Sequence, residues 1–185
     1  MTGAGEQAQA PSGSLEISAL EVPRAGMLGL THCPGRNHRA ADGRHWQRDL
    51  AADLAAVEAW GATALLTLLE LPEFARLGIA DLPAAVGRTR LSWLHLPIPD
   101  MQPPGAAFAA AWEPVRSDVL GRLRRGERLV IHCAAGLGRS GTVAAKLLVT
   151  FDVPAAAAVA LVRRVRPGAV ETPAQEAYVR SGPPL

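Results

Sequence analysis

The stretch LVIHCAAGLGRSGT, Leu129–Thr142, decides the fold expected of this chain. It begins in an apolar run, Arg128–Ile131, that predicts a buried strand, and it ends inside a run, Arg139–Thr150, that predicts a helix. Small residues connect the two, among them Gly136 and Gly138. In open α/β sheets, ligands bind outside the carboxyl ends of the strands, so a binding site is expected in this loop.

The loop has the composition of an anion-binding cradle. Small residues that run into a helix allow successive backbone N–H groups to turn inward, and the helix dipole adds positive charge at the same point. Arg139, at the start of the helix, carries a planar fork of donors that suits two phosphate oxygens. The residues predicted to bind phosphate are Ala134, Ala135, Gly136, Leu137, Gly138 and Arg139.

Cys133 lies at the bottom of this predicted cradle, six residues before Arg139. Backbone N–H groups, a helix N-terminus and a nearby arginine all favour the thiolate, which is the nucleophilic form of cysteine. We therefore expect Cys133 to attack phosphorus, and Ser140 to hydrogen-bond the sulfur as it leaves in a second step. His132 is expected to order the loop by hydrogen bonds rather than to act as a base. The alternative, a buried cysteine in a glycine-containing turn, leaves the spacing of these residues unexplained.

The composition is that of a single globular domain. Of 185 residues, 49% are hydrophobic and 19% are charged, which is the usual range for such domains. The formal net charge of +2 is too small to indicate nucleic acid or a membrane surface as a partner. No apolar run reaches the roughly 18 residues of a membrane span, and the opening MTGAGEQAQAPSGS lacks the pattern of a secretory signal.

The two cysteines, Cys33 and Cys133, imply no disulfide framework. We therefore expect a cytoplasmic protein, and the thiolate chemistry predicted above needs no metal and no other cofactor. The sequence does not indicate the oligomeric state.

Residues 1–13 are small and polar and predict a disordered tail, followed by a single domain over residues 14–185. Short β-prone runs alternate with longer helical ones, which predicts an α/β domain with a mostly parallel, twisted central sheet flanked by helices. The expected strands are Leu15–Leu20, Met27–Thr31, Ala62–Leu68, Leu91–Leu96 and Arg128–Ile131. The expected helices are His45–Trp60, a broken helix over Leu71–Arg88, Gly105–Arg125 interrupted at Pro114, Arg139–Thr150, Pro154–Arg166 and one from Pro173.

The run His132-Cys133-x-x-Gly136-x-x-Arg139-Ser140 resembles the signature of the cysteine-dependent protein tyrosine and dual-specificity phosphatases at every defined position. The chain is most similar to the kinase-associated phosphatase branch of the dual-specificity group. The segments that carry this wider resemblance are Gly29–Arg36, Arg48–Leu69, His95–Asp100 and Ala169–Val179. The resemblance implies a dual-specificity phosphatase-like fold and hydrolysis of phosphate monoesters on proteins through a phosphocysteine intermediate.

The same resemblance implies roles for two residues outside the loop. Relatives use an Asp upstream of the signature as the general acid, and Asp100, about thirty residues before Cys133, is the candidate here. Asp81 and Asp118 are expected to be a helix cap and part of a helix face. Relatives also use a Gln in the C-terminal segment to place the hydrolytic water, and Gln175 holds that position. The alternatives are a turn residue for Asp100 and an exposed helical residue for Gln175.

The loop Thr31–Arg39, THCPGRNHR, is expected either to line the rim of the phosphate pocket or to be a solvated loop. Cys33 within it raises the hypothesis of a reversible disulfide with Cys133 that protects the nucleophile from over-oxidation. Linked peptides found by mass spectrometry after mild peroxide treatment would test this hypothesis.

The expected substrate is a phosphorylated protein or peptide. The one tyrosine, Tyr178, follows the signature, so the tyrosine-containing loop that deepens the pocket of classical tyrosine phosphatases is missing. A shallower pocket admits phosphoserine and phosphothreonine as well as phosphotyrosine. The signature also lacks the lysines of phosphoinositide-specific relatives, which disfavours a lipid headgroup.

Two other functions are compatible with parts of this pattern. An inactive phospho-binding module would bind phosphopeptides without releasing phosphate, but such proteins usually lack the cysteine, the arginine or the acid. Other thiolate chemistry, such as arsenate reduction or sulfur transfer, needs a different loop length or further cysteines.

Overall fold

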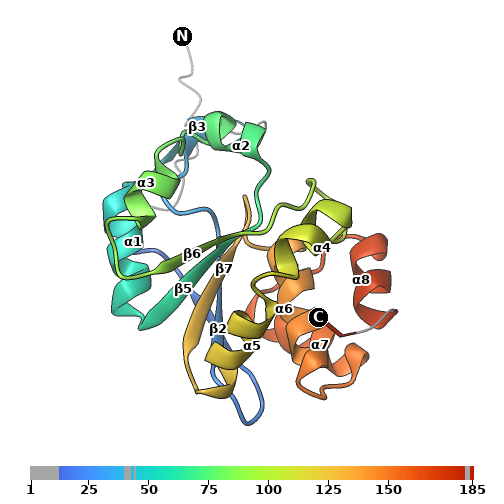
Figure 1. Cartoon of the computed structure of the whole chain (residues 1–185). Coiled ribbons are helices and arrows are strands. Elements are labelled where there is room, and N and C mark those ends of the chain that lie inside the picture. Colours follow the sequence, from blue (N-terminus) through green and yellow to red (C-terminus); the bar gives the residue numbers. More distant parts are fainter. Residues whose placement is uncertain (1–12, 40–42, 44, 182–183) are drawn as a thin grey trace.

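The computed structural model describes residues 13–39, 43, 45–181 and 184–185. The predicted tail over residues 1–13 lies outside this part of the chain except for its last residue. A five-stranded sheet forms the centre of the fold, with the strand order β1-β2-β7-β5-β6 (Figure 1). Its strands are β1 Ser18–Glu21, β2 Met27–Thr31, β5 Ala62–Thr67, β6 Ser92–His95 and β7 Arg128–His132. Only β1 runs antiparallel to its neighbour, so the predicted mostly parallel sheet is confirmed.

Helices cover both faces of this sheet, because its central strands are apolar on both sides. The helices α1 and α3 pack on one face, and α4 to α8 pack on the other (Figure 1). The bounds are α1 Leu50–Ala59, α2 Leu71–Arg76, α3 Leu82–Val86, α4 Ala106–Trp112, α5 Arg116–Arg124, α6 Gly138–Thr150, α7 Ala155–Val165 and α8 Pro173–Arg180. Among the described residues, no helix is both long and apolar enough to cross a membrane.

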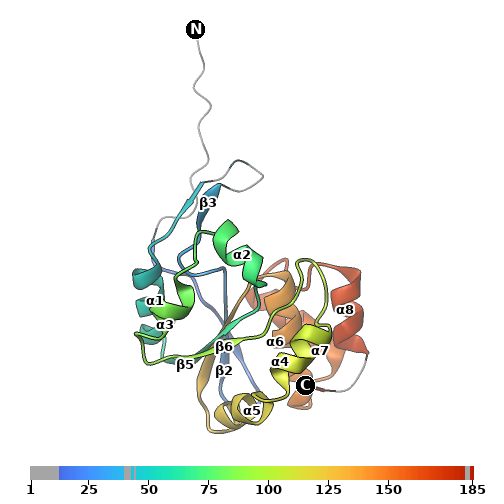
Figure 2. The same cartoon turned by 45° about the horizontal axis from the view of Figure 1, so that its top comes forward.

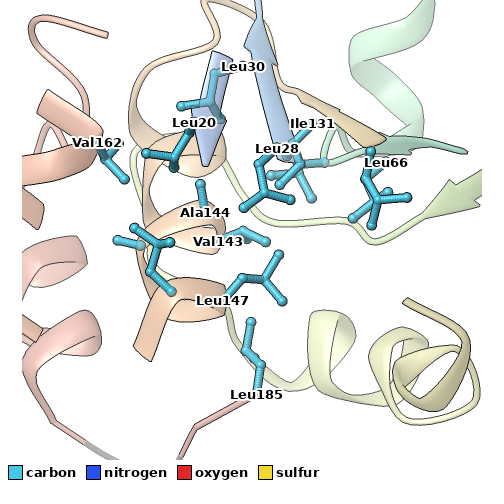
Figure 3. Packing of buried hydrophobic residues seen from close by; sticks show 14 of the residues in the cluster. Leu20, Leu28, Leu30, Leu66, Ile131, Val143, Ala144, Leu147, Val162 and Leu185 are labelled. Atoms are coloured by element: carbon cyan, nitrogen blue, oxygen red, sulfur yellow. The ribbon is translucent and has the colours of Figure 1, made fainter. Parts of the chain in front are cut away.

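The helix α6 lies at the centre of the larger core cluster. Every residue of it from Gly138 to Leu148 is buried. Its apolar side chains pack against those of β2, β5 and β7 and against the C-terminal Leu185 (Figure 3). The residues labelled in that view are Leu20, Leu28, Leu30, Leu66, Ile131, Val143, Ala144, Leu147, Val162 and Leu185. The rigid packing of α6 fixes the position of the loop that precedes it.

The predicted helix His45–Trp60 is wrong in its first turn. His45–Gln47 forms β4, which pairs antiparallel with β3 Asn37–Arg39, and neither strand was predicted. The helix α1 begins after Asp49, whose side chain accepts a hydrogen bond of 2.8 Å from the N–H of Ala52. The other predicted strands and helices are present within a few residues, including the breaks in the segments that contain Pro83 and Pro114.

Candidate active site

The segment between β7 and α6 turns sharply at Gly136, where the backbone φ is +72°. A Cβ at this position would overlap the carbonyl oxygen of Thr31, so the turn requires glycine both for its conformation and for space. The turn brings the N–H of Gly136 to 3.2 Å from Sγ of Cys133, to which it donates a hydrogen bond. The thiol therefore lies inside the loop, where its sulfur accepts a backbone N–H.

Two arginines bind the outer side of this loop. Arg36 donates to the carbonyl oxygen of Ala134 at 3.2 Å. Arg166 donates to the carbonyl oxygens of Ala135 at 3.2 Å and Gly136 at 3.3 Å. A trans peptide plane whose carbonyl points outward directs its N–H to the opposite side. The two arginines thus hold the loop in the conformation of an anion cradle, with its N–H groups turned inward.

The start of α6 adds positive potential to the cradle. The helix is capped by Leu137 without any side-chain hydrogen bond, so its first N–H groups are not used by a capping side chain. Cys133, at the end of β7, is only 3% exposed and packs in the core cluster around α6. The N–H of Gly136 is thus placed at the sulfur, and the binding of phosphate by residues 134–139 stays a prediction.

Arg139 is held by a residue that the sequence did not indicate. Its guanidinium donates to both carboxylate oxygens of Glu73, at 2.6 and 3.0 Å, and to the carbonyl oxygen of Ile98 at 3.1 Å. Burial acts to raise the pKa of Glu73, but its hydrogen bonds with Arg139 and with the N–H of Glu70 outweigh burial and hold the pKa below its usual range. The bidentate pair fixes the plane of the guanidinium.

Asp100 lies at the same guanidinium. Its Oδ1 is 3.0 Å from Nη2 of Arg139, and it also accepts the N–H of Met101 at 3.1 Å. The Asp100 side chain is 55% exposed, so it lies at the mouth of the cradle and not within the core. The structure thus brings Asp100 to the cradle. Asp81 is the N-cap residue of α3, and Asp118 forms an exposed ion pair with Arg122 on α5, as expected.

Gln175 is fully buried, so its interpretation as an exposed helical residue is wrong. Its side-chain oxygen accepts the N–H groups of Glu171 and Thr172 at the start of α8, at 2.9 and 3.2 Å. Its side-chain nitrogen donates to the carbonyl oxygen of Gln102 at 3.3 Å. The side chain lies against the start of α6, since a Cβ on Gly138 would be only 2.9 Å from Nε2. Gln175 therefore joins α8 to the segment that carries Asp100.

Ser140 is buried beside the cradle in the first turn of α6. Its hydroxyl makes no hydrogen bond with any residue that the structure describes. The predicted hydrogen bond to the sulfur is therefore not formed in this state of the site, and the role of Ser140 stays a prediction.

His132 connects the loop to the sheet beneath it. Nε2 lies 2.8 Å from the hydroxyl of Thr67, and Nδ1 lies 3.2 Å from the carbonyl oxygen of Cys133. Thr67 also accepts the indole N–H of Trp93 at 2.9 Å. A consistent proton arrangement has Thr67 donating to Nε2 and a neutral imidazole donating from Nδ1. Burial lowers the pKa of His132 to about 4, although the hydrogen bond with Cys133 acts in the opposite direction.

Because His132 stays neutral in the folded chain, we expect the free energy of unfolding to fall as the pH drops from about 6.5 towards about 4. The unfolded chain takes up a proton in that window and the folded chain does not, which contributes a slope of up to about 1.4 kcal/mol per pH unit. Urea unfolding measured at several pH values in this window should show a shallower slope in His132→Gln, which keeps a polar atom near Thr67. His32, whose pKa burial also lowers, is present in both proteins. An unchanged slope would contradict the assignment.

The loop Thr31–Arg39 does line a cavity beside the cradle, and its interpretation as a solvated loop is wrong for its first half, since residues 31–35 are buried. The cavity measures about 460 Å³ and is lined by Arg36, His38, Arg39, Arg76, Leu77, Asp100 and Ala134. The elements α2 and β3, which contribute residues to this cavity, lie next to each other in Figure 2.

Cys33 and Cys133 pack in different core clusters, on opposite faces of the sheet. The N–H of Cys33 donates to the carbonyl oxygen of Ala134 at 3.1 Å, so the two cysteines lie on neighbouring chain segments. Burial raises the pKa of the Cys33 thiol well above its ordinary value. The reversible disulfide between Cys33 and Cys133 stays a prediction.

Comparison with known proteins places this arrangement among phosphatases. Residues 47–179, more than two thirds of the chain, match the family described as "PTP-SAK: Swiss Army Knife protein, DSP-PTPase phosphatase domain". A solved structure of kinase-associated phosphatase, with its catalytic-site cysteine substituted by serine, matches with a TM-score of 0.79 and 24% identity. The match covers 91% of this chain and 94% of that chain.

Two further solved structures share the fold. Tk-PTP in its active form matches with a TM-score of 0.62 and 27% identity over 88% of this chain and 94% of that chain. A protein described as a tyrosine phosphatase from Leishmania major matches with a TM-score of 0.68 and 19% identity, over 90% of this chain and 98% of that chain. The predicted fold class is confirmed.

Proposed function

The chain belongs to the family of DSP-PTPase phosphatase domains, and we propose that it hydrolyses phosphate monoesters on proteins through a phosphocysteine formed at Cys133. The resemblance to cysteine-dependent phosphatases is confirmed at the level of this family. The observation that most supports the proposed mechanism is the ion pair of 3.0 Å between Asp100 and Arg139. It joins the candidate acid, from the segment after β6, to the candidate clamp at the start of α6.

In the first step, the thiolate of Cys133 attacks phosphorus in line with the departing alkoxide or phenoxide. The sulfur–phosphorus bond forms, the phosphorus–oxygen ester bond breaks, and Asp100 gives its proton to the leaving oxygen. Inward N–H groups of residues 134–138 and the guanidinium of Arg139 stabilise the charge on the three equatorial oxygens. The phosphate takes the position facing Arg139 that the carboxylate of Asp100 now occupies, which leaves Asp100 beside the leaving oxygen.

In the second step, a water molecule attacks the phosphocysteine. Asp100 accepts a proton from this water, the sulfur–phosphorus bond breaks, and inorganic phosphate and the thiolate of Cys133 are released. Ser140 is proposed to donate a hydrogen bond from its hydroxyl to the departing thiolate, which is consistent with a buried hydroxyl that has no partner among the described residues. Gln175 is proposed to help to place the water, because its side chain lies between the start of α6 and the segment that carries Asp100.

The proposed substrates are phosphotyrosine residues and also phosphoserine and phosphothreonine residues. The one tyrosine of the chain, Tyr178, lies on α8 and contacts Lys146, so it is not available to deepen the pocket. We place the reaction in the cytoplasm, since Cys33 and Cys133 are both free thiols, which reducing compartments maintain.

Asp100→Asn tests the proposed function directly. We expect the unaltered protein to hydrolyse p-nitrophenyl phosphate and phosphotyrosine peptides in the presence of EDTA, because arginine and N–H groups supply the positive charge. Asn keeps the shape of Asp100 but has no proton to give, so kcat should fall about 10²-fold. This loss is expected for phosphotyrosine peptides, whose phenoxide needs a proton to depart, and it should be smaller for p-nitrophenyl phosphate, whose nitrophenoxide departs largely without one. An equal loss for both leaving groups would contradict the role of general acid, and unaltered protein without turnover would contradict the function.

A further inference from the structure

The cavity beside the cradle, defined above by seven lining residues, is strongly basic. Among the residues that the structure describes, three arginines and one histidine line it, together with one carboxylate, Asp100. Its basic residues come from two separate parts of the chain, the segment that leads into and forms β3 and the C-terminal turn of α2. Such a gathering of arginines beside a phosphate cradle lowers the energy of a second negative charge on the same substrate.

The cavity borders the proposed catalytic site and shares two residues with it. Ala134 is the first cradle residue after Cys133, and Asp100 is the proposed acid at the mouth, and both line the cavity. A phosphorylated side chain that enters the cradle therefore places the rest of its substrate at the entrance of this cavity. The volume of about 460 Å³ is large enough for an acidic side chain or a phosphorylated one.

The fold holds two of the basic groups in place. The guanidinium of Arg36 lies 4.2 Å from the ring centroid of Trp46 and donates to the carbonyl oxygen of Ala134. Arg76 contacts a carboxylate oxygen of Glu73 at 3.0 Å. Positive charges that are fixed by stacking and hydrogen bonds lose less side-chain entropy on binding an anion than mobile surface arginines do.

Exposed apolar groups on the segments that carry Arg76 and Asp100 favour a peptide over a small phosphorylated compound. Among the described residues, Leu71 and Met101 are the two large hydrophobic side chains that are exposed. Leu71 begins α2, which also carries Glu73 and Arg76, and Met101 follows Asp100 directly. Such side chains can pack against apolar parts of a peptide, which a small phosphorylated compound lacks.

We propose that the basic cavity binds a second acidic group of a peptide substrate, either an Asp or Glu side chain or a second phosphorylated residue, close to the residue that is dephosphorylated. This inference rests on the proposed function, because it assigns the substrate class of the same site. It adds a specificity determinant, the cationic side chains of Arg36, Arg39 and Arg76, to the cradle that binds the scissile phosphate.

The test compares phosphotyrosine peptides that carry one Glu, at each neighbouring position in turn, with a peptide that carries Ala throughout. We expect the best acidic peptide to have a kcat/KM about fivefold above that of the Ala peptide. The expected gain is modest because Arg39 is exposed, so that solvent and salt screen part of its attraction to the acidic group of the peptide. The ratio should fall towards one as sodium chloride is raised. A peptide with a second phosphorylated residue at the same position should gain at least as much as the Glu peptide.

Two variants of Arg39 provide the decisive readout, because they leave Arg36 and Arg76, with their contacts to the cradle and to Glu73, unchanged. Arg39→Gln should reduce the ratio, and Arg39→Glu should bring it to one or below. Arg90→Gln is the matched control, since Arg90 is an exposed arginine that lines a cavity at the amino ends of the strands. The control should keep the ratio of the unaltered protein.

Three results would overturn the proposal. They are equal kcat/KM values for acidic and neutral peptides, a ratio that the Arg39 variants leave unchanged, and preferential hydrolysis of inositol polyphosphates over every peptide in the panel. Turnover of p-nitrophenyl phosphate by the unaltered protein separates these results from a failure of the proposed function. If p-nitrophenyl phosphate is hydrolysed while the peptides show no acidic preference, only the inference on specificity fails.

Discussion

Replacing Cys133 with serine is expected to reduce the turnover of p-nitrophenyl phosphate by at least about 10³-fold, since a hydroxyl in the cradle is not ionised and attacks phosphorus poorly. The change removes no packing, because the two side chains are similar in size and Cys133 is buried between β7 and α6. The Gly136 N–H and the guanidinium of Arg139 remain. We therefore expect Cys133→Ser to bind phosphotyrosine peptides with an affinity close to that of the unaltered protein.

Mass spectrometry of rapidly quenched reactions should detect a phosphorylated Cys133 in the unaltered protein and no modified residue in the variant. Cys33→Ala is the matched control, because Cys33 packs in the other core cluster and takes no part in the proposed reaction. Its turnover should stay within a few-fold of the unaltered protein. Full activity in Cys133→Ser would contradict the nucleophile. Peptide binding without turnover by the unaltered protein would instead indicate a phospho-binding module.

The strand–turn–helix segment that carries the cradle was predictable from the sequence because its parts are local. A strand, a glycine turn and a helix follow one another within Leu129–Thr142, and each is specified by neighbouring residues. The φ of +72° at Gly136 requires glycine, and the N-terminus of α6 follows at once. Asp100 was predictable from a resemblance in spacing, but the ion pair with Arg139 that brings it to the cradle depends on the tertiary fold.

Glu73 was not predictable, because its partner Arg139 lies 66 residues further along the chain. In the sequence of α2, LPEFAR, Glu73 lies in the first turn, where a glutamate indicates only a favourable interaction with the helix N-terminus. It does form a capping box with Glu70, and this local role conceals the contact with Arg139. The one available signal was the need of a buried arginine for a carboxylate partner, and the sequence did not show that Arg139 is 2% exposed.

The pair β3 and β4 was missed for a similar reason. Each strand has three residues, with polar side chains in most positions, so neither shows a clear alternation of apolar and polar residues. Trp46 was assigned to an apolar helix face, whereas its ring packs against the guanidinium of Arg36, a residue that lines the basic cavity. Short strands of this kind are stabilised by tertiary contacts, here by the hydrogen bond of 2.8 Å from Asn37 to the carbonyl oxygen of Leu77.

Arg139→Lys is expected to lower kcat/KM for p-nitrophenyl phosphate by about 10³-fold, the scale at which a single arginine stabilises phosphoryl transfer. A lysine cannot bind both carboxylate oxygens of Glu73 and two phosphate oxygens with one planar group. Glu73→Gln tests the same unit from its other side. It keeps the guanidinium in the site but removes the charge that fixes its plane, so we expect a smaller loss of about tenfold in kcat/KM.

The stability of Glu73→Gln, measured beside its activity, separates a positioning role of Glu73 from a purely structural one. Removing one partner of a buried ion pair costs about 3 kcal/mol or more, so Glu73→Gln should lower the free energy of unfolding measured with urea. Glu176→Gln, which removes an exposed carboxylate that pairs with two arginines, is the matched control and should leave the urea midpoint nearly unchanged. Bound inorganic phosphate should restore part of the stability of Glu73→Gln, because the anion replaces the missing charge beside Arg139. If Glu73→Gln is destabilised yet keeps full kcat/KM, Glu73 only supports the fold. If Glu73→Gln loses activity at temperatures well below its unfolding, the carboxylate holds Arg139 in its catalytic orientation.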